Sequence, residues 1–279
     1  MRQIGLDELK SIQLEILDVV AKFCEERGIN YWIDAGTLLG AIRHKGYIPW
    51  DDDFDVGLLR PDYDRFMKEF NGTYPRYECR CLENDPDFYA AFGKVYDNRT
   101  VLYEPDEKGT KIAVYIDIFV YDNAPDDEAQ CRKMLRNQMI YERLNIARVF
   151  PIHIRPNGGI IRKILVYIMR TAIHMIPSSL LPVNYFAVKT VQNAKQFMHE
   201  DTKRVGDFSG QHRVTWSKDV LRSFIDVEFE GRKYKAPVGY DAWLRGFYGD
   251  YMTPPPEHKR ISRHRFKAFV KENQEGGNN

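Results

Sequence analysis

The stretch Tyr31-Trp-Ile-Asp-Ala-Gly-Thr-Leu-Leu-Gly-Ala-Ile-Arg-His-Lys-Gly-Tyr-Ile-Pro-Trp-Asp-Asp-Asp-Phe-Asp-Val56 joins a Gly-Thr turn, a basic cluster and an acidic run with four aspartates over 51–55. Carboxylates held close together repel one another, so folding them together is costly unless a cation lies between them. Their hard oxygens suit magnesium or manganese, and the nearby basic, glycine-rich backbone suits phosphate. The segment therefore predicts a site for a divalent metal and a phosphate group.

The alternation of side chains along a strand indicates which acids act together. Residues two apart point to the same face, so Asp53 and Asp55 are expected to project together, and Asp51 joins them if the strand begins early. Asp117, in the otherwise apolar run 114–120, is the best candidate for a third acid. A lone carboxylate in such a run needs a partner if it is buried, and a metal would supply one. The alternative is an edge-strand aspartate that faces solvent.

Two other interpretations account for less of the acidic run. A calcium-binding EF-hand loop requires Gly at its sixth position and Glu at its twelfth, where this chain has Val56 and Asp62. Turn and helix-capping aspartates in the loop after Pro49-Trp50 explain Asp51 or Asp52, but not all four acids. The divalent-metal interpretation is therefore retained.

Charge is distributed unevenly along the 279 residues, although the net charge is only +1. Residues 1–130 hold 15 Lys or Arg and 27 Asp or Glu, whereas residues 131–279 hold 26 and 13. This asymmetry favours an acidic, metal-binding half joined to a basic half that meets an anionic partner. Two solvated surfaces of opposite sign that hold the halves together are the alternative.

Neither the first residues nor the cysteines indicate secretion. Residues 1–10 contain no apolar core of the secretory type. The four cysteines (Cys24, Cys79, Cys81 and Cys131) lack the spacing of a disulfide framework or a zinc ribbon. We expect a reduced, cytoplasmic setting.

The first half, residues 1–125, predicts a mixed α/β catalytic core. Apolar residues at helical spacing indicate an amphipathic helix from Asp7 to about Arg27, which Gly28 ends. Helices are also expected over 38–42 and 62–70, the latter with Pro61 in its first turn. Strands are expected over 31–33, 54–59, 77–82, 88–96, 100–103 and 114–121.

The second half, residues 126–279, is expected to be basic and largely helical. Residues 126–148 predict a long polar helix, 151–159 a loop, and 224–235 a hairpin that turns at Glu230-Gly231. An aromatic, Pro-rich segment over 240–256 is expected to complete the site, and 275–279 are expected to be disordered. The two halves together predict an α+β fold.

The apolar segment 160–176 allows two interpretations. Its length and its three cations, Arg162, Lys163 and Arg170, exclude a spanning helix, which needs roughly 20 mostly apolar residues. The segment can lie in a membrane interface with its apolar face down and its basic groups at the headgroups. It can equally be a buried helix of the basic half, and both alternatives stay open.

The string from Asp34 to Val56 closely resembles the signature of the LicD family, phosphocholine transferases of bacterial surface polysaccharides and teichoic acids that are related to fukutin-related protein. Later blocks support the resemblance more loosely: Lys94 with Asn98 and Thr100, then Asp117-Ile-Phe119, then Tyr248-Gly-Asp-Tyr-Met252.

This family is similar in turn to the nucleotidyltransferase fold of the DNA polymerase beta type, a mixed sheet flanked by helices. There a Gly-Ser or Gly-Thr turn cradles phosphate, an Asp-x-Asp pair binds metal, and a third carboxylate lies on a later strand. Gly36-Thr37, Asp53-x-Asp55 and Asp117 match those places in this chain.

The resemblance implies transfer of phosphocholine, or a similar phospho-alcohol, from a CDP-linked donor to a sugar hydroxyl, with release of CMP. Mg²⁺ or Mn²⁺ would be held by Asp53 and Asp55, with Asp117 beside it as ligand or proton acceptor and Asp51 as a further candidate ligand. Phosphate would be bound by the Gly36-Thr37 turn. The further phosphate candidates are Arg43, His44 and Lys94, each of which can also be an ordinary surface or loop residue.

The choice of donor depends on how the alcohol is held. Choline requires an aromatic box, because a quaternary ammonium is bound by ring faces. Trp50, beside the acids, is one candidate, and a core tryptophan is the alternative. CDP-ribitol or CDP-glycerol would require hydroxyl-binding residues instead.

The acceptor is expected to be a polysaccharide, a teichoic acid or a lipid-linked saccharide. The basic half could meet it at the inner membrane face through 160–176, and no recognised nucleic-acid motif is visible.

Two rival functions use the same acids. A nucleotidyltransferase would pass NMP from an NTP to a small molecule or an RNA end and release pyrophosphate. A non-catalytic binding protein would use the carboxylates to hold calcium for structural reasons. Release of CMP or of pyrophosphate separates the first rival, and retention of ligand binding in an Asp53→Asn variant separates the second.

Overall fold

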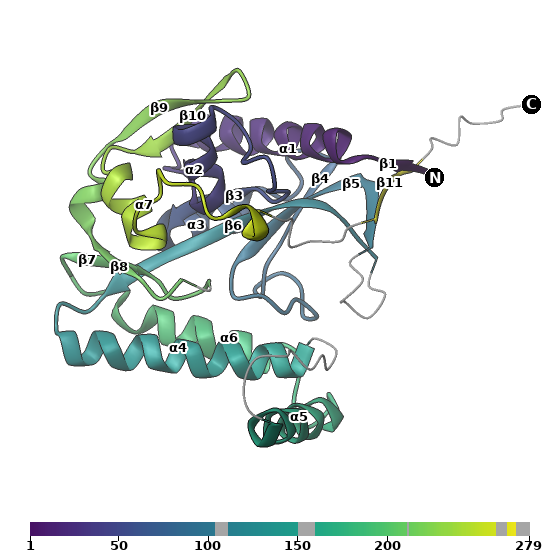
Figure 1. The fold of residues 1–279 in the computed structure, drawn as a ribbon, viewed down its shortest axis with the longest axis vertical. Helices are drawn as coiled ribbons and strands as arrows, with labels where there is room; N and C mark the ends of the chain where they lie inside the picture. Colours follow the sequence, from purple (N-terminus) through teal and green to yellow (C-terminus); the bar gives the residue numbers. More distant parts are fainter. Residues whose placement is uncertain (104–110, 150–159, 211, 261–266, 272–279) are drawn as a thin grey trace, which may run out of the picture.

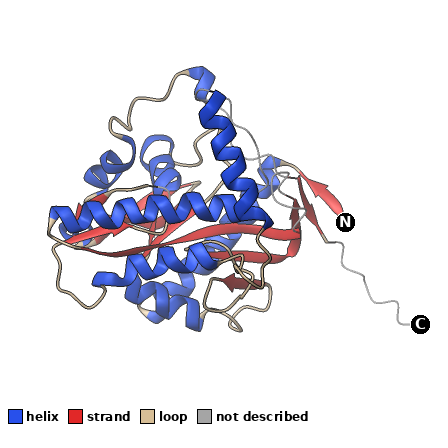
Figure 2. Ribbon diagram, turned by 90° about the horizontal axis from the view of Figure 1, so that it is seen from below, coloured by secondary structure: helices blue, strands red, loops and turns tan. Residues whose placement is uncertain are grey.

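The computed structural model describes residues 1–103, 111–149, 160–210, 212–260 and 267–271. Within them a mixed sheet is flanked by helices, which confirms the expected α+β class (Figure 1 and Figure 2). The predicted loop 151–159 and the predicted disordered end 275–279 lie outside these residues.

The first helix, α1 (Leu6–Arg27), covers β5 and β6 of the sheet. Ile12, Ile16 and Val20 recur at helical spacing and are buried, so the apolar stripe that predicted the helix is also its packing face. Gly28 ends it in the left-handed conformation, with φ 61°, and its N–H bonds back to the carbonyls of Cys24 and Glu25.

The main sheet brings together strands from both ends of the sequence. Its central order is β1-β11-β5-β6-β3-β2, with β4 added to β5 and the pair β7 and β8 added to β6. β3 and β6 run parallel, whereas their other neighbours are antiparallel. The strands are β1 (Arg2–Ile4), β2 (Trp32–Ile33), β3 (Asp55–Leu59), β4 (Tyr77–Arg80), β5 (Gly93–Tyr103), β6 (Lys111–Ala124), β7 (Arg204–Asp207), β8 (Thr215–Ser217) and β11 (Lys267–Val270).

Three helices of the second half, α4 (Glu128–Val149), α5 (Ile160–Met175) and α6 (Tyr185–Ala194), gather at one end of the molecule. α6 and α5 both contact α4, and α5 lies at the outer edge beyond it (Figure 1). The predicted hairpin is confirmed as β9 (Phe224–Phe229) and β10 (Arg232–Pro237), with the turn at Glu230 and Gly231. The remaining helices are α2 (Ala35–His44), α3 (Arg60–Glu69) and α7 (Tyr240–Tyr248), with short 3-10 turns at Lys195–Phe197, Lys218–Leu221 and Glu257–Lys259.

Three predictions of local structure were wrong in detail. The helix expected over 38–42 begins already at Ala35, so Gly36 and Thr37 lie in its first turn rather than in a preceding loop. The strand expected over 88–96 begins only at Gly93, and it continues through a β-bulge into the one expected over 100–103. The segments forming β1, β7, β8 and β11 were not recognised as strands.

Helix α5 turns its apolar residues outward. Among its side chains that the structure describes none is buried, so the buried-helix alternative for 160–176 is wrong. Within the described ranges no helix combines the length and the apolar character needed to cross a bilayer.

Candidate active site

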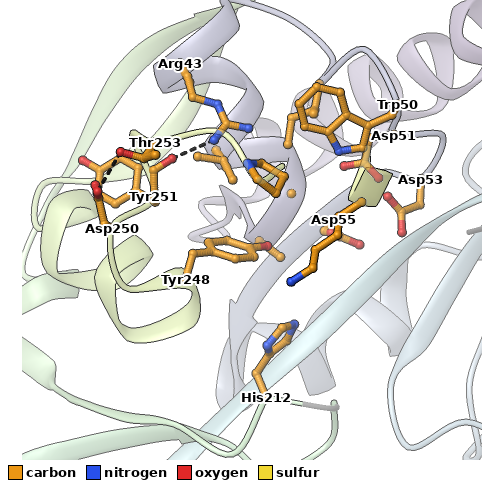
Figure 3. Close-up of a pocket in the computed structure, with 16 residues that line it drawn as sticks. Arg43, Trp50, Asp51, Asp53, Asp55, His212, Tyr248, Asp250, Tyr251 and Thr253 are labelled. Carbon is orange, nitrogen blue, oxygen red and sulfur yellow. Dashed lines mark hydrogen bonds between the residues drawn. The ribbon is translucent and has the colours of Figure 1, made fainter. Parts of the chain in front are cut away.

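A cavity of about 540 Å³ opens between the acidic segment, helix α2 and the chain that follows α7 (Figure 3). Its first wall comes from residues 35–55 and its second from residues 212–259, so parts of the sequence far apart face each other across it. The lining residues are Ala35, Gly36, Leu39, Arg43, Ile48, Trp50, Asp51, Asp53, Asp55, His212, Tyr248, Asp250, Tyr251, Thr253, Pro255 and Lys259.

The acidic run alternates between the cavity and the interior of the protein. Asp51, Asp53 and Asp55 line the cavity, as the two-residue period of an extended chain predicts, although strand β3 itself begins only at Asp55. Asp52 and Phe54 are buried on the other side. The backbone carbonyl of Asp52 accepts a 3.0 Å hydrogen bond from Gln13 of α1, which ties this segment to the core.

Asp55 is the most buried of the three cavity acids, with 7% of its surface exposed. Burial and the charges of Asp53, Asp117 and Asp51 raise its pKa well above the ordinary value. Bringing these carboxylates together is therefore unfavourable in the protein alone, and a bound cation would relieve the repulsion.

Asp117 lies beside Asp55 but not on the cavity wall. The parallel register of β3 and β6 pairs the two residues directly, and β6 has strands on both sides, so the edge-strand alternative is wrong. Across the antiparallel neighbour β5, Lys94 is paired with Asp117 and its Nζ lies 2.6 Å from Asp117 Oδ1. Lys94, Asp117 and Asp55 thus form a row across three adjacent strands.

The first turn of α2 supports the acids as well as lining the cavity. The Thr37 hydroxyl accepts a 2.9 Å hydrogen bond from the backbone N–H of Asp55. A Cβ on Gly36 would lie 2.7 Å from Asp51 Oδ2, so only glycine lets that carboxylate approach the helix. Ala35 adopts the left-handed conformation with φ 42°, a strained backbone at the edge of the cavity.

The two basic residues at the end of α2 differ in position. Arg43 lines the cavity and donates a 2.7 Å hydrogen bond from Nη1 to the carbonyl of Tyr251, which joins the two walls. Its Nε donates to His44 Nε2 at 2.9 Å. Burial and the charge of Arg43 lower the pKa of His44, so its ring is neutral at pH 7. His44 does not line the cavity.

The second wall supplies two basic residues that sequence reasoning did not identify, His212 and Lys259. It also contains Tyr248, from the segment 240–256, which points its hydroxyl toward the acids (Figure 3). No local pattern marks His212 or Lys259. Trp50 is half-buried: it lines the cavity and also packs against the hydrophobic core, so it combines both expected positions.

Asp34 anchors the second wall to the first. Its side chain is fully buried and accepts hydrogen bonds from the Tyr121 hydroxyl of β6 and, at 2.7 Å, from Trp243 Nε1 of α7. Burial raises the pKa of this carboxyl. Asp34 is the first residue of the string that resembles the family signature. In the structure it positions α7 and does not face the cavity.

The loop that carries His212 is organised by a second buried carboxylate, Asp207. Its oxygens accept hydrogen bonds from the backbone N–H groups of Ser209, Gly210 and His212. Burial nevertheless raises its pKa to about 7. Gln138 of α4 donates to the Gly210 carbonyl at 2.7 Å and holds the same loop from outside.

The donor atoms fit a magnesium ion that shares its shell with a substrate. Within the described residues no three His, Cys, Asp or Glu side chains are arranged to enclose a metal. Mg²⁺, however, is commonly bound by one or two carboxylates and completes its octahedron with water and phosphate oxygens. Asp53 and Asp55 at the cavity wall meet that requirement, and the pKa of Asp55 is raised by burial and by the neighbouring carboxylate charges that a cation would offset.

Comparison with known proteins gives the same family for the short motif and for the whole chain. Residues 28–161 match the family described as LicD/FKTN/FKRP, nucleotidyltransferase domain. The lipopolysaccharide cholinephosphotransferase LicD of Haemophilus influenzae is 30% identical over 280 residues, which cover 97% of this chain and 100% of that protein.

Two human proteins match shorter stretches of the chain. The ribitol 5-phosphate transferase FKRP is 50% identical over 38 residues, 14% of this chain and 8% of that protein. The ribitol-5-phosphate transferase FKTN is 37% identical over 49 residues, 18% of this chain and 11% of that protein. All three relatives are phosphotransferases, which confirms the expected class of enzyme. Because it matches one member over nearly its whole length and the family's domain over residues 28–161, the chain belongs to the LicD family.

Proposed function

We propose that this protein transfers phosphocholine, or a related phospho-alcohol, from its CDP conjugate to a hydroxyl of a cell-surface glycan, teichoic acid or lipid-linked saccharide. The observation that carries the proposal is the cavity in which Asp51, Asp53 and Asp55 face the basic residues Arg43 and Lys259. The full-length similarity to a lipopolysaccharide cholinephosphotransferase supports the same chemistry. The volume of about 540 Å³ falls in the range of small-molecule sites.

In this proposal the first wall binds the diphosphate of the donor. Asp53 and Asp55 would hold Mg²⁺ or Mn²⁺, with Asp51 close by. The bound ion would neutralise phosphate charge and stabilise the attacking and leaving oxygens of an in-line displacement. The amide groups in the first turn of α2, at Gly36 and Thr37, present the positive end of a helix dipole to the same region.

Cationic side chains would bind the remaining phosphate oxygens. Arg43 and Lys259 line the cavity and suit that role. Lys94 forms an ion pair with Asp117, and His44 has a lowered pKa and lies outside the cavity lining. Both residues are therefore weaker candidates for direct phosphate contact than the sequence predicted. Their participation stays a prediction.

The proposed transfer needs only one group that accepts a proton. The acceptor hydroxyl oxygen forms a bond to the phosphorus that carries the alcohol, while the bond from that phosphorus to the bridging oxygen of CMP breaks. Asp117 is proposed to receive the hydroxyl proton, directly or through water, with Lys94 as its counter-charge. CMP takes the electron pair of the broken bond and leaves.

Three aromatic residues support choline as the alcohol. Trp50, Tyr248 and Tyr251 line the cavity, and ring faces attract quaternary ammonium groups. The Trp50 ring already lies 5.5 Å from the guanidinium carbon of Arg260, so one face of this ring contacts a cation. A donor that carries ribitol or glycerol would leave these rings without a matching group.

The proposal is tested by incubating the protein with CDP-choline, CDP-ribitol or CDP-glycerol, Mg²⁺ and a lipopolysaccharide acceptor. Mass spectrometry of the acceptor and assay of released CMP report the reaction. We expect an added phosphocholine and equimolar CMP, lost on chelation of the metal. Release of pyrophosphate from an NTP, without reaction of any CDP-alcohol, would favour the nucleotidyltransferase rival and overturn the proposal.

A further inference from the structure

Helix α5 has an apolar face and a polar face, and its orientation is the reverse of that in an ordinary surface helix. At 3.6 residues per turn, six large apolar residues fall within an arc of about 140°. Arg170 and His174 lie on the opposite side, and the exposed Val166 and Tyr167 lie outside the arc. The six apolar residues are Ile164, Leu165, Ile168, Met169, Met175 and Ile176.

The apolar face is the exposed one. The exposed fractions reach 61% at Leu165, 57% at Ile168 and 74% at Met175, and the adjoining loop adds Leu180 at 78%. Arg170 and His174 are less exposed than this face. An amphipathic helix of a globular protein normally buries its apolar stripe, so the orientation of α5 leaves a hydrophobic surface to be covered.

Polar contacts attach the C-terminal end of α5 to the body of the protein. The buried Arg148 of α4 donates from Nη1 to the carbonyls of Ile173 and His174, and from Nη2 to Ser178 Oγ and the carbonyl of Leu181. The guanidinium thus satisfies carbonyls in the last turn of the helix, where a positive charge is also favoured by the dipole. The attachment holds the helix in place and uses none of its apolar arc.

The sequence around α5 is strongly basic. From Arg143 to His199 it contains eight Lys or Arg residues and no Asp or Glu. Basic residues near an exposed apolar helix are typical of helices that lie in the interface of a bilayer, because cations interact with anionic headgroups while apolar side chains enter the acyl boundary. A protein partner with an apolar groove explains the exposed face but does not require this charge.

We propose that α5, together with Leu180, docks into the headgroup region of an anionic lipid bilayer. The helix would lie in the plane of the interface, with Leu165, Ile168 and Met175 toward the acyl chains. This inference goes beyond the proposed transfer reaction and does not depend on it. It places the protein at a surface where lipid-linked molecules are found.

Binding of the full-length protein to vesicles tests the proposal. We expect co-flotation with phosphatidylcholine vesicles that contain phosphatidylglycerol, weaker flotation with phosphatidylcholine alone, and a loss of binding as the salt concentration rises. Ile168→Glu should lower the partition coefficient about tenfold or more, since it removes a buried apolar group and adds a repelled charge. Because Ile168 is exposed in the free protein, circular dichroism should show an unchanged fold.

Ile140→Glu is the matched control. Ile140 lies on α4 and is 43% exposed, so the substitution makes the same chemical change on a neighbouring helix of the basic half. It should bind vesicles like the unmodified protein. Equal loss in both variants, or equal binding to neutral and anionic vesicles, would overturn the proposal. So would a dimer in solution that Ile168→Glu dissociates, because a second copy of the chain would then be the occupant of this face.

Discussion

Asp55 and Asp117 lie directly beside each other on the parallel strands β3 and β6, and Lys94 completes the row on β5. The acid that lines the cavity and the acid beside it are therefore positioned by interior strands rather than by loops. The two carboxylates repel each other, but they stay close because backbone hydrogen bonds fix both strands. One of these bonds, of 2.8 Å, runs from the Asp117 N–H to the Phe54 carbonyl.

Asp55→Asn should abolish transfer and yet stabilise the protein in the absence of metal. The raised pKa of Asp55 shows that its ionised form is disfavoured in the fold, so a neutral amide removes that penalty. Each kcal/mol gained corresponds to roughly 2–4 °C in melting temperature for a protein of about this size. We expect Mg²⁺ to raise the melting temperature of the unmodified protein but not of this variant.

Asp52→Asn controls for the loss of an acid from the same run. Asp52 is buried away from the cavity, so its variant should keep the Mg²⁺-induced shift whatever happens to its melting temperature without metal. If Asp52→Asn loses the Mg²⁺ response and Asp55→Asn keeps it, the assignment of the cavity acids is wrong.

Gly36→Ala should damage the site more than the fold. Its Cβ would meet the Asp51 carboxylate at 2.7 Å, and displacement of a positioned group by about 1 Å can cost on the order of 10²-fold in rate. The comparison is Gly40→Ala in the same helix, whose Cβ would meet the backbone carbonyl of Gly46 at 2.4 Å. That clash should lower stability by about 1–3 kcal/mol. Measurement of kcat/KM and urea unfolding separates the two effects, and a reversed pattern would contradict this account.

Removal of Lys94 should cost more than removal of both partners of its ion pair. The side chains of Lys94 and Asp117 are 8% and 15% exposed, so Lys94→Met leaves a mostly buried carboxylate without this counter-charge, at a cost of roughly 3 kcal/mol. Addition of Asp117→Asn should recover part of that loss. Urea unfolding of the single and double variants gives the coupling energy. Strictly additive losses would mean that the pair is not coupled in solution.

Asp207 should make the stability of the protein fall as the pH rises from about 4 to 7. Its pKa is about 7 in the folded protein against an ordinary value of 3.8, so the folded state binds the extra proton in this interval. The stabilising contribution is complete below pH 4 and is lost as the pH passes 7, by at most about 4 kcal/mol at 1.36 kcal/mol per pKa unit.

The measurement is the difference in unfolding free energy between the unmodified protein and Asp207→Asn at several pH values. It should decline over that interval, because the lost hydrogen bond in the variant does not depend on pH. A constant difference would show that Asp207 does not titrate there.

Tyr248 allows the aromatic binding of choline to be separated from hydrogen bonding. Tyr248→Phe keeps the ring and should leave the KM for CDP-choline within about threefold, whereas Tyr248→Leu should raise it about five- to thirtyfold, the range expected for a lost cation–π contact. CDP-ribitol serves as the comparison donor. An increase in KM for Tyr248→Phe as large as that for Tyr248→Leu would assign the role to the hydroxyl instead.

Local sequence patterns predicted those structural features that are set by residues close together in the chain. The stripe in α1 and the alternation of Asp51, Asp53 and Asp55 follow from periods of 3.6 and two residues. The end of α1 at Gly28 and the hairpin turn at Glu230-Gly231 follow from the access of glycine to positive φ. The complete site could not be predicted from such local patterns, because tertiary contacts place half of its wall.

The missed parts share a physical cause. Strands β1, β7, β8 and β11 are three or four residues long, too short to show alternation, and pairing with longer neighbours creates them. His212 and Lys259 reach the cavity because Asp207 and Asp34 hold their surroundings, and a buried carboxylate with that role has no sequence signature. Similarly, the outward orientation of α5 depends on where Arg148 binds it.

The division of the cavity between residues 35–55 and 212–259 has a consequence for the order of synthesis. A ribosome completes the acidic wall early, but the aromatic and basic wall is added only after some two hundred further residues. A nascent chain can therefore gather its repelling carboxylates long before the opposite wall exists to close the cavity over them.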